Sequence, residues 1–241
     1  MTKGATKEAP FVNSLGMKFV PVEITGGPTN GKRVVFSVWD TRVQDYAEYA
    51  QEKGVTPEKP FFEQGPTHPV VNVRWDDAKA FCAWLTDKER ASGKIGANDE
   101  YRLPSDHEWS CAVGIGRREK AEASPKSKDG KIEKVYPWGT QWPPPKGAGN
   151  YVPSLQVDEF EKTSPVGSFA ANTFGLYDMG GNVWQWCGDW YDEEKNHCVL
   201  RGASWYSSIE VFLRSTFRNH FHPSFCCDVI GFRCVLVISG G

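Results

Sequence analysis

The sequence predicts an α+β protein, and two observations lead to that class. Two amphipathic helical patterns lie in the first half of the chain, and short β-type runs with glycine-rich connections lie behind them. No internal repeat and no interdomain linker separates these parts. We therefore predict one domain over residues 10–241, preceded by a flexible N-terminal arm over residues 1–9.

The first expected element is a β-hairpin within residues 17–40. Two runs rich in β-branched and aromatic residues, MKFVPVEI and RVVFSVWD, flank the turn-rich stretch TGGPTNGK. Thr41 and Gln44 then have the spacing of a helix capping box. A helix is expected to begin there and to end at Gly54, because glycine commonly terminates helices.

A second helix is expected to begin near Asp76. Its core-facing stripe has helical spacing and consists of Ala78, Phe81, Cys82 and Leu85. A shorter helix should follow Ser105, which forms a capping box with Glu108. From about residue 112 to 172 the chain is first charged and then dense in proline and glycine. Such a long irregular stretch needs something else to order it.

Composition excludes several classes of function. The chain has 241 residues, 39% of them hydrophobic, with ten tryptophans and a net charge of −2, which argues against nucleic-acid and anionic-membrane surfaces. No apolar run approaches membrane-spanning length, and no signal peptide is visible, so we expect a cytoplasmic protein.

The seven cysteines form no CxxC pair or spaced metal-ligand set. Reduced thiols are the simplest interpretation, although a structural disulfide remains an alternative. The adjacent Cys226 and Cys227 are interpreted as two surface or semi-buried thiols.

The segment from Tyr206 to Ile230 differs in composition from its neighbours. It holds four Phe, one Tyr, two His and the adjacent Cys pair, without an alternation that would sort them into core and surface. It contains no Lys, Gln, Met or Trp, and its only Glu is Glu210. None of these five residue types has a codon ending in a pyrimidine. The pattern favours a surface diversified for binding, and the alternative is an aromatic-rich end of the core.

Several motifs carry a family resemblance. In order they are NSLGMKFVPV, PVVNVRWDDAKAFCAWL, YRLPSDHEW, GLYDMGGNVWQW, VLRGASW and GFRCV. Over residues 11–236 the chain resembles the formylglycine-generating-enzyme (sulfatase-modifying factor) domain. The resemblance implies a C-type lectin-like fold with two helices, short antiparallel strands and long loops.

The resemblance also allows a check for catalysis. The enzymes hold copper(I) between two cysteines five positions apart, and soft thiolates suit that ion. On the shared spacing of Arg214 and Arg218, these positions fall on Glu210 and Ser215, which supply no thiolate. We therefore expect no catalytic residues and no copper.

Another branch of the same fold fits the unusual segment. The chain resembles the variable proteins of diversity-generating retroelements, in which adenine-directed mutagenesis converts AAY codons to NNY codons. The framework residues that stay fixed are Arg201, Gly202, Ser204, Trp205, Leu213, Arg214, Ser215, Arg218, Pro223, Gly231, Phe232 and Arg233. The resemblance implies variable, ligand-binding positions at Tyr206, Ser207, Ser208, Ile209, Val211, Phe212, Phe217, Asn219, His220, Phe221, Phe225, Cys226, Cys227 and Val229.

Calcium is the cofactor that the resemblance implies. In the enzymes two Ca²⁺ ions organise long loops through side-chain and backbone oxygens. One matching set is Asn150, Tyr151, Asp158 and Phe160. The other is Asp178, Gly181, Val183 and Gln185. Gln185 stands where the family commonly has Glu, which weakens the second site. The alternative is that these are hydrogen-bonded loop residues without an ion.

Two histidine patterns receive ordinary interpretations. His107 follows the capping turn and is expected to face solvent or to cap the helix. His220 and His222, near Cys226 and Cys227, could bind a transition metal, but chance clustering in the variable segment is the preferred interpretation.

The leading function is a non-catalytic ligand-binding protein with a diversified surface. We expect a monomer whose ligand, of unknown identity, is another protein. We expect no nucleic-acid partner and no membrane span. The alternatives are a recognition or regulatory domain of a modular signalling protein and, as a third, a copper-dependent formylglycine-generating oxidase.

Overall fold

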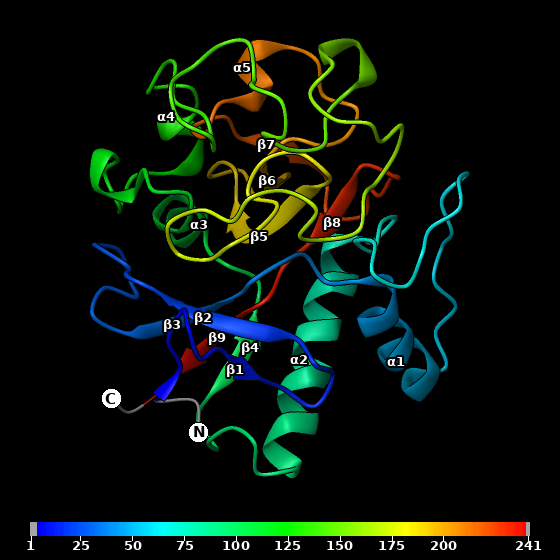
Figure 1. Cartoon of the computed structure of the whole chain (residues 1–241). Helices are drawn as coiled ribbons and strands as arrows, with labels where there is room; N and C mark the ends of the chain where they lie inside the picture. Colours follow the sequence, from blue (N-terminus) through cyan, green and yellow to red (C-terminus); the bar gives the residue numbers. More distant parts are fainter. Residues whose placement is uncertain (1–3, 240–241) are drawn as a thin grey trace.

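The computed structural model describes residues 4–239, and a five-stranded antiparallel sheet occupies its lower half in Figure 1. In sheet order the strands are β1 (Phe11–Val12), β2 (Lys18–Val22), β3 (Arg33–Ser37), β9 (Val235–Ile238) and β4 (Glu100–Arg102). The predicted hairpin is confirmed, with Phe19 paired to Ser37 across β2 and β3. Because β9 lies between β3 and β4, the end of the chain is central to this sheet.

A four-stranded sheet lies above the first in Figure 1 and includes one strand within the segment Tyr206–Ile230 and another that begins at its last residue. In sheet order its strands are β7 (Asn219–Phe221), β6 (Cys198–Arg201), β5 (Trp184–Trp190) and β8 (Ile230–Phe232). β5 and β8 pair in parallel, and the other two pairs are antiparallel. β6 and β8 therefore bracket the whole chain segment from Gly202 to Val229, which must leave the sheet and return to it.

The described residues form fewer α-helices than strands, and most of these helices are short. They are α1 (Val43–Lys53), α2 (Trp75–Ala91), α3 (Asp106–Ala112), α4 (Pro125–Lys128) and α5 (Glu210–Leu213), with 3₁₀ turns η2 (Gly116–Arg118) and η3 (Pro153–Leu155). The predicted box of Ser105 and Glu108 caps α3, and Gly54 ends α1 with a left-handed φ of 66°.

The predicted cap of α1 was wrong by one residue. The N-cap is Arg42, whose backbone N–H donates to the Asp45 carboxylate at 2.9 Å. Thr41 cannot cap the helix because its backbone N–H donates to Phe232 O and its carbonyl accepts from Val70 N. The extended segment before the helix therefore links Val70 to Phe232 of β8 through the backbone of Thr41.

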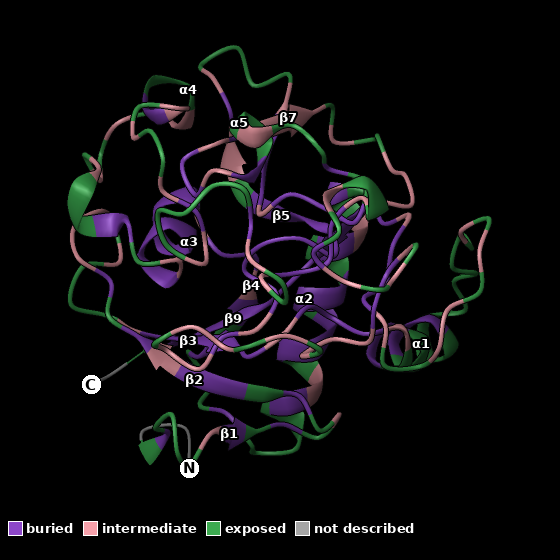
Figure 2. Ribbon diagram, turned by 45° about the horizontal axis from the view of Figure 1, so that its top comes forward, coloured by how far each residue is buried: buried purple, intermediate pink, exposed green. Residues whose placement is uncertain are grey.

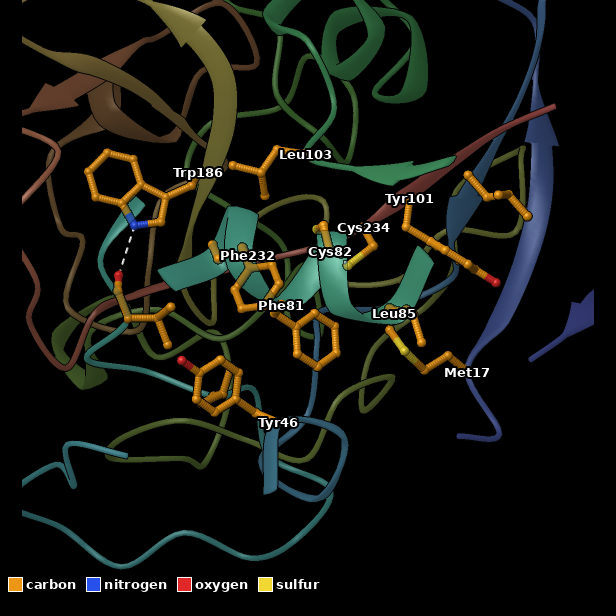
Figure 3. Close-up of a cluster of buried hydrophobic side chains, with 14 of the residues drawn as sticks. Met17, Tyr46, Phe81, Cys82, Leu85, Tyr101, Leu103, Trp186, Phe232 and Cys234 are labelled. Carbon is orange, nitrogen blue, oxygen red and sulfur yellow. Dashed lines mark hydrogen bonds between the residues drawn. The ribbon is translucent and has the colours of Figure 1, made fainter. Parts of the chain in front are cut away.

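The predicted stripe on α2 faces the main core. Ala78, Phe81, Cys82 and Leu85 are buried, as predicted. Figure 3 shows Phe81 beside Tyr46 of α1 and Phe232 of β8. The Trp186 indole donates to Val73 O at 2.9 Å. The helix thus joins both sheets in one hydrophobic cluster.

The irregular stretch over residues 112–172 contains only α4 and the two 3₁₀ turns, as predicted. It covers the upper part of the molecule in Figure 1. Exposed and half-buried segments gather around α5 and β7 in Figure 2, whereas the strands beneath are buried. The second sheet therefore supports a surface made mainly of loops.

The described part of the expected N-terminal arm, residues 4–9, packs against the body. Ala5 is buried, and its carbonyl oxygen accepts a hydrogen bond from the Arg33 guanidinium. Lys7 Nζ donates to Thr173 O at 3.1 Å. Residues 1–3 of the expected arm lie outside the described residues. Within residues 4–239, no helix has both the length and the apolar character needed to cross a membrane.

Candidate ligand-binding face

The segment from Tyr206 to Val229 forms one end of the molecule, which we call the variable face. It leaves β6, includes α5 and β7, and returns to β8. Figure 1 shows α5 and β7 in orange at the end opposite the first sheet. The predicted variable residues are thus gathered at one end of the molecule, on loops, on α5 and on the edge strand β7.

A buried ionic cluster fixes the framework beneath this face. Asp106, at the start of α3, accepts hydrogen bonds from Arg201 and Arg218 and forms an ion pair with Lys128 at 2.7 Å. Glu119 pairs with Arg218 at 2.7 Å. Burial alone would raise the pKa of Asp106, but the three neighbouring cations hold that pKa well below its usual range. The carboxylate is therefore charged and anchors two framework arginines.

The positions compared with the copper cysteines also have structural contacts. Glu210 accepts a hydrogen bond from the Tyr136 hydroxyl at 2.6 Å and one from Arg214 at 3.2 Å. Ser215 is buried, its N–H donates to Val135 O, and its carbonyl oxygen accepts from Arg201. Both residues therefore tie the variable face to the loop before it.

The predicted variable residues fall into three classes of exposure. Six are exposed, namely Tyr206, Ser208, Ile209, Val211, Phe212 and Phe225. Seven are half-buried, namely Phe217, Asn219, His220, Phe221, Cys226, Cys227 and Val229. Only Ser207 is buried, so its assignment to a ligand-contacting surface is wrong. Its hydroxyl accepts from Ser204 N at 3.1 Å and closes a tight turn.

The aromatic side chains of the face form two ring pairs and one separate ring. Phe212 and Phe217 have ring centroids 4.9 Å apart, and Phe221 and Phe225 are stacked at 4.4 Å. Phe217 and Phe221 also pack against the main core, whereas their partners point outward. Tyr206 is 68% exposed and contacts the buried Trp205. Each of the exposed rings, Phe212, Phe225 and Tyr206, thus packs against a more deeply buried aromatic ring.

The first predicted calcium set is brought together in one loop. Asp158 accepts hydrogen bonds from Tyr151 N at 2.9 Å and Phe160 N at 2.8 Å, which closes the loop. Asn150 is buried, and its Oδ1 has no hydrogen-bond partner among residues 4–239. An orphaned amide oxygen beside a carboxylate loop fits an oxygen-seeking cation. These residues therefore fit calcium, and the same hydrogen bonds also close the loop without it.

The second predicted set fits calcium poorly. Gln185 Oε1 accepts from Trp109 Nε1 at 2.9 Å and from Arg233 Nε at 2.8 Å. A carbonyl oxygen has two lone pairs, so these two donors leave none for a metal. Asp178 is buried with Oδ1 unpartnered in the described chain, and burial raises its pKa to about 6. The positive Arg233 guanidinium already lies within this set.

His107 does not face solvent, which corrects the prediction. It is 5% exposed, and its Nε2 lies 2.7 Å from Thr25 O and 3.6 Å from Cys111 Sγ. Helix α3 directs this side chain toward Thr25, in the loop that follows β2. A capping pattern in the sequence does not predict that tertiary contact.

The histidines and cysteines of the face also point to different partners. His220 stacks on Tyr191 at 3.8 Å, whereas Cys226 contacts Glu58. Within residues 4–239 no group of three His, Cys, Asp or Glu side chains could hold a metal. Cys226 and Cys227 are free, half-buried thiols.

Three residues beside the face were missed by the sequence analysis. Phe61 and Phe62, from the loop between α1 and α2, and Lys162, from the long irregular stretch, contact each other or Trp205. They lie far from the variable segment along the chain, and no periodicity marks them. The one sequence feature that could have indicated a surface contact there is the pair Phe61 and Phe62 in a turn-rich loop.

Comparisons with known sequences identify the family. The model of the sulfatase-modifying factor enzyme 1-like domain matches residues 6–238. The inactive C-alpha-formylglycine-generating enzyme 2 of Bos taurus is 34% identical over 182 residues, covering 69% of this chain and 49% of that protein. The serine/threonine-protein kinase pkn1 of Chlamydia caviae is 32% identical over 185 residues, covering 69% of this chain and 24% of that protein. The chain spans about half the length of the first relative and less of the second.

Solved structures confirm the predicted α+β, C-type lectin-like fold. PvdO from Pseudomonas aeruginosa superposes with a TM-score of 0.66 at 24% identity, covering 95% of this chain and 99% of that one. Treponema denticola variable protein 1 superposes with a TM-score of 0.65 at 20% identity, covering 93% and 96%. With its sequence match spanning nearly the whole chain, the protein belongs to the sulfatase-modifying factor enzyme 1-like domain family, that of the formylglycine-generating enzymes.

Proposed function

We propose that this protein is a non-catalytic ligand-binding protein that displays a diversified surface on the family scaffold. The observation that carries the proposal is the variable face itself. Six of its predicted variable side chains are exposed, while four framework residues, Arg201, Leu213, Ser215 and Arg218, are buried. A surface of this kind can change its outer side chains without changing the contacts that hold the fold.

The chemistry of the same segment supports the absence of catalysis. No cysteine occurs between Cys198 and Cys226, so no thiolate pair at the required spacing exists there. Relatives of both kinds match the chain, an inactive enzyme 2 from Bos taurus and a formylglycine-generating enzyme from Mus musculus. Family membership therefore leaves the activity open, and the residues decide it.

A protein or peptide ligand fits the exposed side chains best. Rigid aromatic rings provide a large contact area at low entropic cost, as in antibody loops. The net charge of −2 disfavours nucleic acid. Treponema denticola variable protein 1 has the same fold, and its name supports a variable binding surface for this chain. We also propose one structural calcium ion, held by Asn150 and Asp158 with backbone oxygens of Tyr151 and Phe160.

A second function has one observation in its favour. The chlamydial kinase pkn1 contains a region similar to 69% of this chain, which covers only 24% of the kinase. In that setting this chain would serve as a recognition or regulatory domain of a modular signalling protein. Its binding face would be the same, but its ligand-contacting residues would be constant between gene copies.

Peptide selection tests the proposed function. A phage-displayed random dodecapeptide library is selected on the immobilised protein, and each enriched peptide is measured on the triple variant Tyr206→Ser, Phe212→Ser, Phe225→Ser. These three rings are exposed, so the variant should keep the thermal midpoint of the wild type. We expect enriched peptides that bind the wild type and lose affinity for the variant. Equal binding to both proteins, or no enrichment, would contradict the proposal.

A further inference from the structure

Four aromatic rings extend the variable face onto a constant loop. Phe61 is 73% exposed and meets Phe62 edge-on, with ring centroids 5.3 Å apart. Phe62 contacts Trp205 at 5.6 Å, and Trp205 contacts Tyr206 at 5.5 Å. Tyr206 is the first residue of the variable face. The rings therefore form a chain from the loop between α1 and α2 to the edge of that face.

A lysine ammonium lies within these rings. Lys162 Nζ is 4.6 Å from the Trp205 ring centroid and 5.1 Å from that of Phe61. Both distances are in the range of cation–π attraction. None of the ion pairs formed within residues 4–239 includes Lys162. The charge therefore lies against aromatic faces, and no carboxylate within residues 4–239 forms an ion pair with it.

The two loops that carry these side chains are tied together. Gln64 Nε2 donates to Thr163 Oγ1 at 3.0 Å, and His68 Nδ1 lies 3.0 Å from the same oxygen. Asn150 Nδ2 donates to Lys162 O at 2.7 Å, which links the lysine to the loop of the proposed calcium site. The arrangement is thus set by contacts outside the variable residues, and little ordering is needed when a partner binds.

We propose that Phe61 and Lys162 form a constant edge of the binding face, next to the variable Tyr206, and that this edge receives an acidic peptide segment of the partner. The segment would place a carboxylate on Lys162 and an apolar or aromatic side chain against Phe61 and Tyr206. This inference rests on the proposed function and names residues and a ligand chemistry beyond it. A constant edge would orient many different ligands while the rest of the face selects among them.

The acidic class follows from charge complementarity. An ammonium among apolar rings is partly shielded from water, so a charge-assisted hydrogen bond to a carboxylate there is stronger than one in open solvent. One lysine at this edge, on a chain of net charge −2, does not make a phosphate-binding stripe. The partner therefore supplies one or a few carboxylates beside apolar side chains.

The test uses the dodecapeptides selected on the wild-type protein. We expect them to be enriched in Asp or Glu next to aromatic or aliphatic residues. Lys162→Met keeps an apolar stem on the rings and removes the charge, so it should weaken their binding about tenfold, as for one hot-spot residue. Lys162→Arg should restore it. Phe61→Ser should weaken it similarly, and raising the salt concentration should weaken wild-type binding more than that of Lys162→Met.

Two matched controls separate this effect from a general loss of charge or apolar surface. Lys94→Met changes an exposed lysine beyond the far end of α2, and Val12→Ser changes an exposed side chain on β1. Neither should alter peptide binding, and all variants should keep the wild-type thermal midpoint. Selected peptides that depend on Tyr206, Phe212 or Phe225 but not on Phe61 or Lys162 would overturn the constant edge and leave the proposed function standing. Absence of any enriched peptide would overturn both.

Discussion

Arg218 donates two hydrogen bonds to the Asp106 carboxylate, from Nε at 3.0 Å and from a terminal nitrogen at 3.1 Å. One residue stands just before β7 in the variable face, and the other begins α3, more than a hundred positions earlier. Both are fully or almost fully buried. The pair thus anchors the variable face to α3.

Asp106→Asn should be strongly destabilising. The substitution removes one negative charge and leaves Arg201, Arg218 and Lys128 with insufficient compensation in a buried site. Breaking a buried ion pair by removing one partner typically costs about 3–5 kcal/mol. Urea unfolding monitored by circular dichroism measures the loss. Glu23→Gln breaks the exposed pair with Arg117 and should leave the midpoint nearly unchanged. Equal midpoints for Asp106→Asn and the wild type would show that the cluster does not hold the face.

Asp178 should make stability depend on pH. Burial raises its pKa from 3.8 to about 6, so the folded state binds this proton more tightly than the unfolded state. The stabilising contribution is therefore complete below about pH 4 and is lost as the pH rises through about 6. Asp178→Asn removes the charge, and asparagine tolerates the left-handed φ of 54° found here.

The variant should gain stability relative to the wild type as the pH rises. The difference in pKa corresponds to about 3 kcal/mol at most, so we expect a relative gain of about 2 kcal/mol between pH 4.5 and pH 7.5. Urea unfolding of both proteins at several pH values in this range measures it. A difference between the two proteins that is constant with pH, or that shrinks as pH rises, would refute the assignment.

Calcium should stabilise the fold through the first loop only. An ion that binds the native loop and not the unfolded chain raises the thermal midpoint by mass action. We expect a chelator to lower the midpoint, Asp158→Ala to remove that sensitivity, and calorimetric titration to show one ion per chain. Gln185→Glu restores the carboxylate that the family commonly has and should favour a second ion. A midpoint indifferent to chelator, on protein shown to be free of bound metal, would reject the site.

Copper-dependent oxidation should be absent. The protein is incubated with copper(I) and a peptide containing the CxPxR motif, and the peptide is examined by mass spectrometry. Because Glu210 and Ser215 are engaged in framework contacts and carry no thiol, the peptide cysteine should stay unmodified. Conversion of that cysteine beyond a control without protein would show that the family activity persists by another route.

Local patterns in the sequence predicted the helices and strands better than the residues at which they begin and the contacts between them. The stripe on α2 and the cap at Ser105 follow from helical spacing, and both are found. Thr41 has the side chain of a cap, but its backbone is already used between Val70 and Phe232. Such a tertiary contact leaves no periodic signal in the sequence.

In the candidate site, too, the location could be predicted from the sequence, but the tertiary contacts could not. Codon composition and family motifs located the variable face, yet the burial of Ser207 depends on the turn it closes with Ser204. Phe61 and Lys162 join the face only because two distant loops meet at Thr163. The parallel pairing of β5 with β8 likewise depends on how the long segment between them returns. These features are set by packing between segments that are far apart in the chain.

We propose that the exposed residues of the variable face have been diversified while the framework has not. The most direct measurement is the DNA sequence flanking the gene. We predict a near-copy of codons 200–236 beside a reverse-transcriptase gene. The copy should have adenines at codons such as those of Tyr206, Phe212 and Phe225, and it should be identical at the codons of Arg201 and Arg218. Flanking DNA without such a copy, or a copy whose differences fall on the buried framework codons, would contradict it.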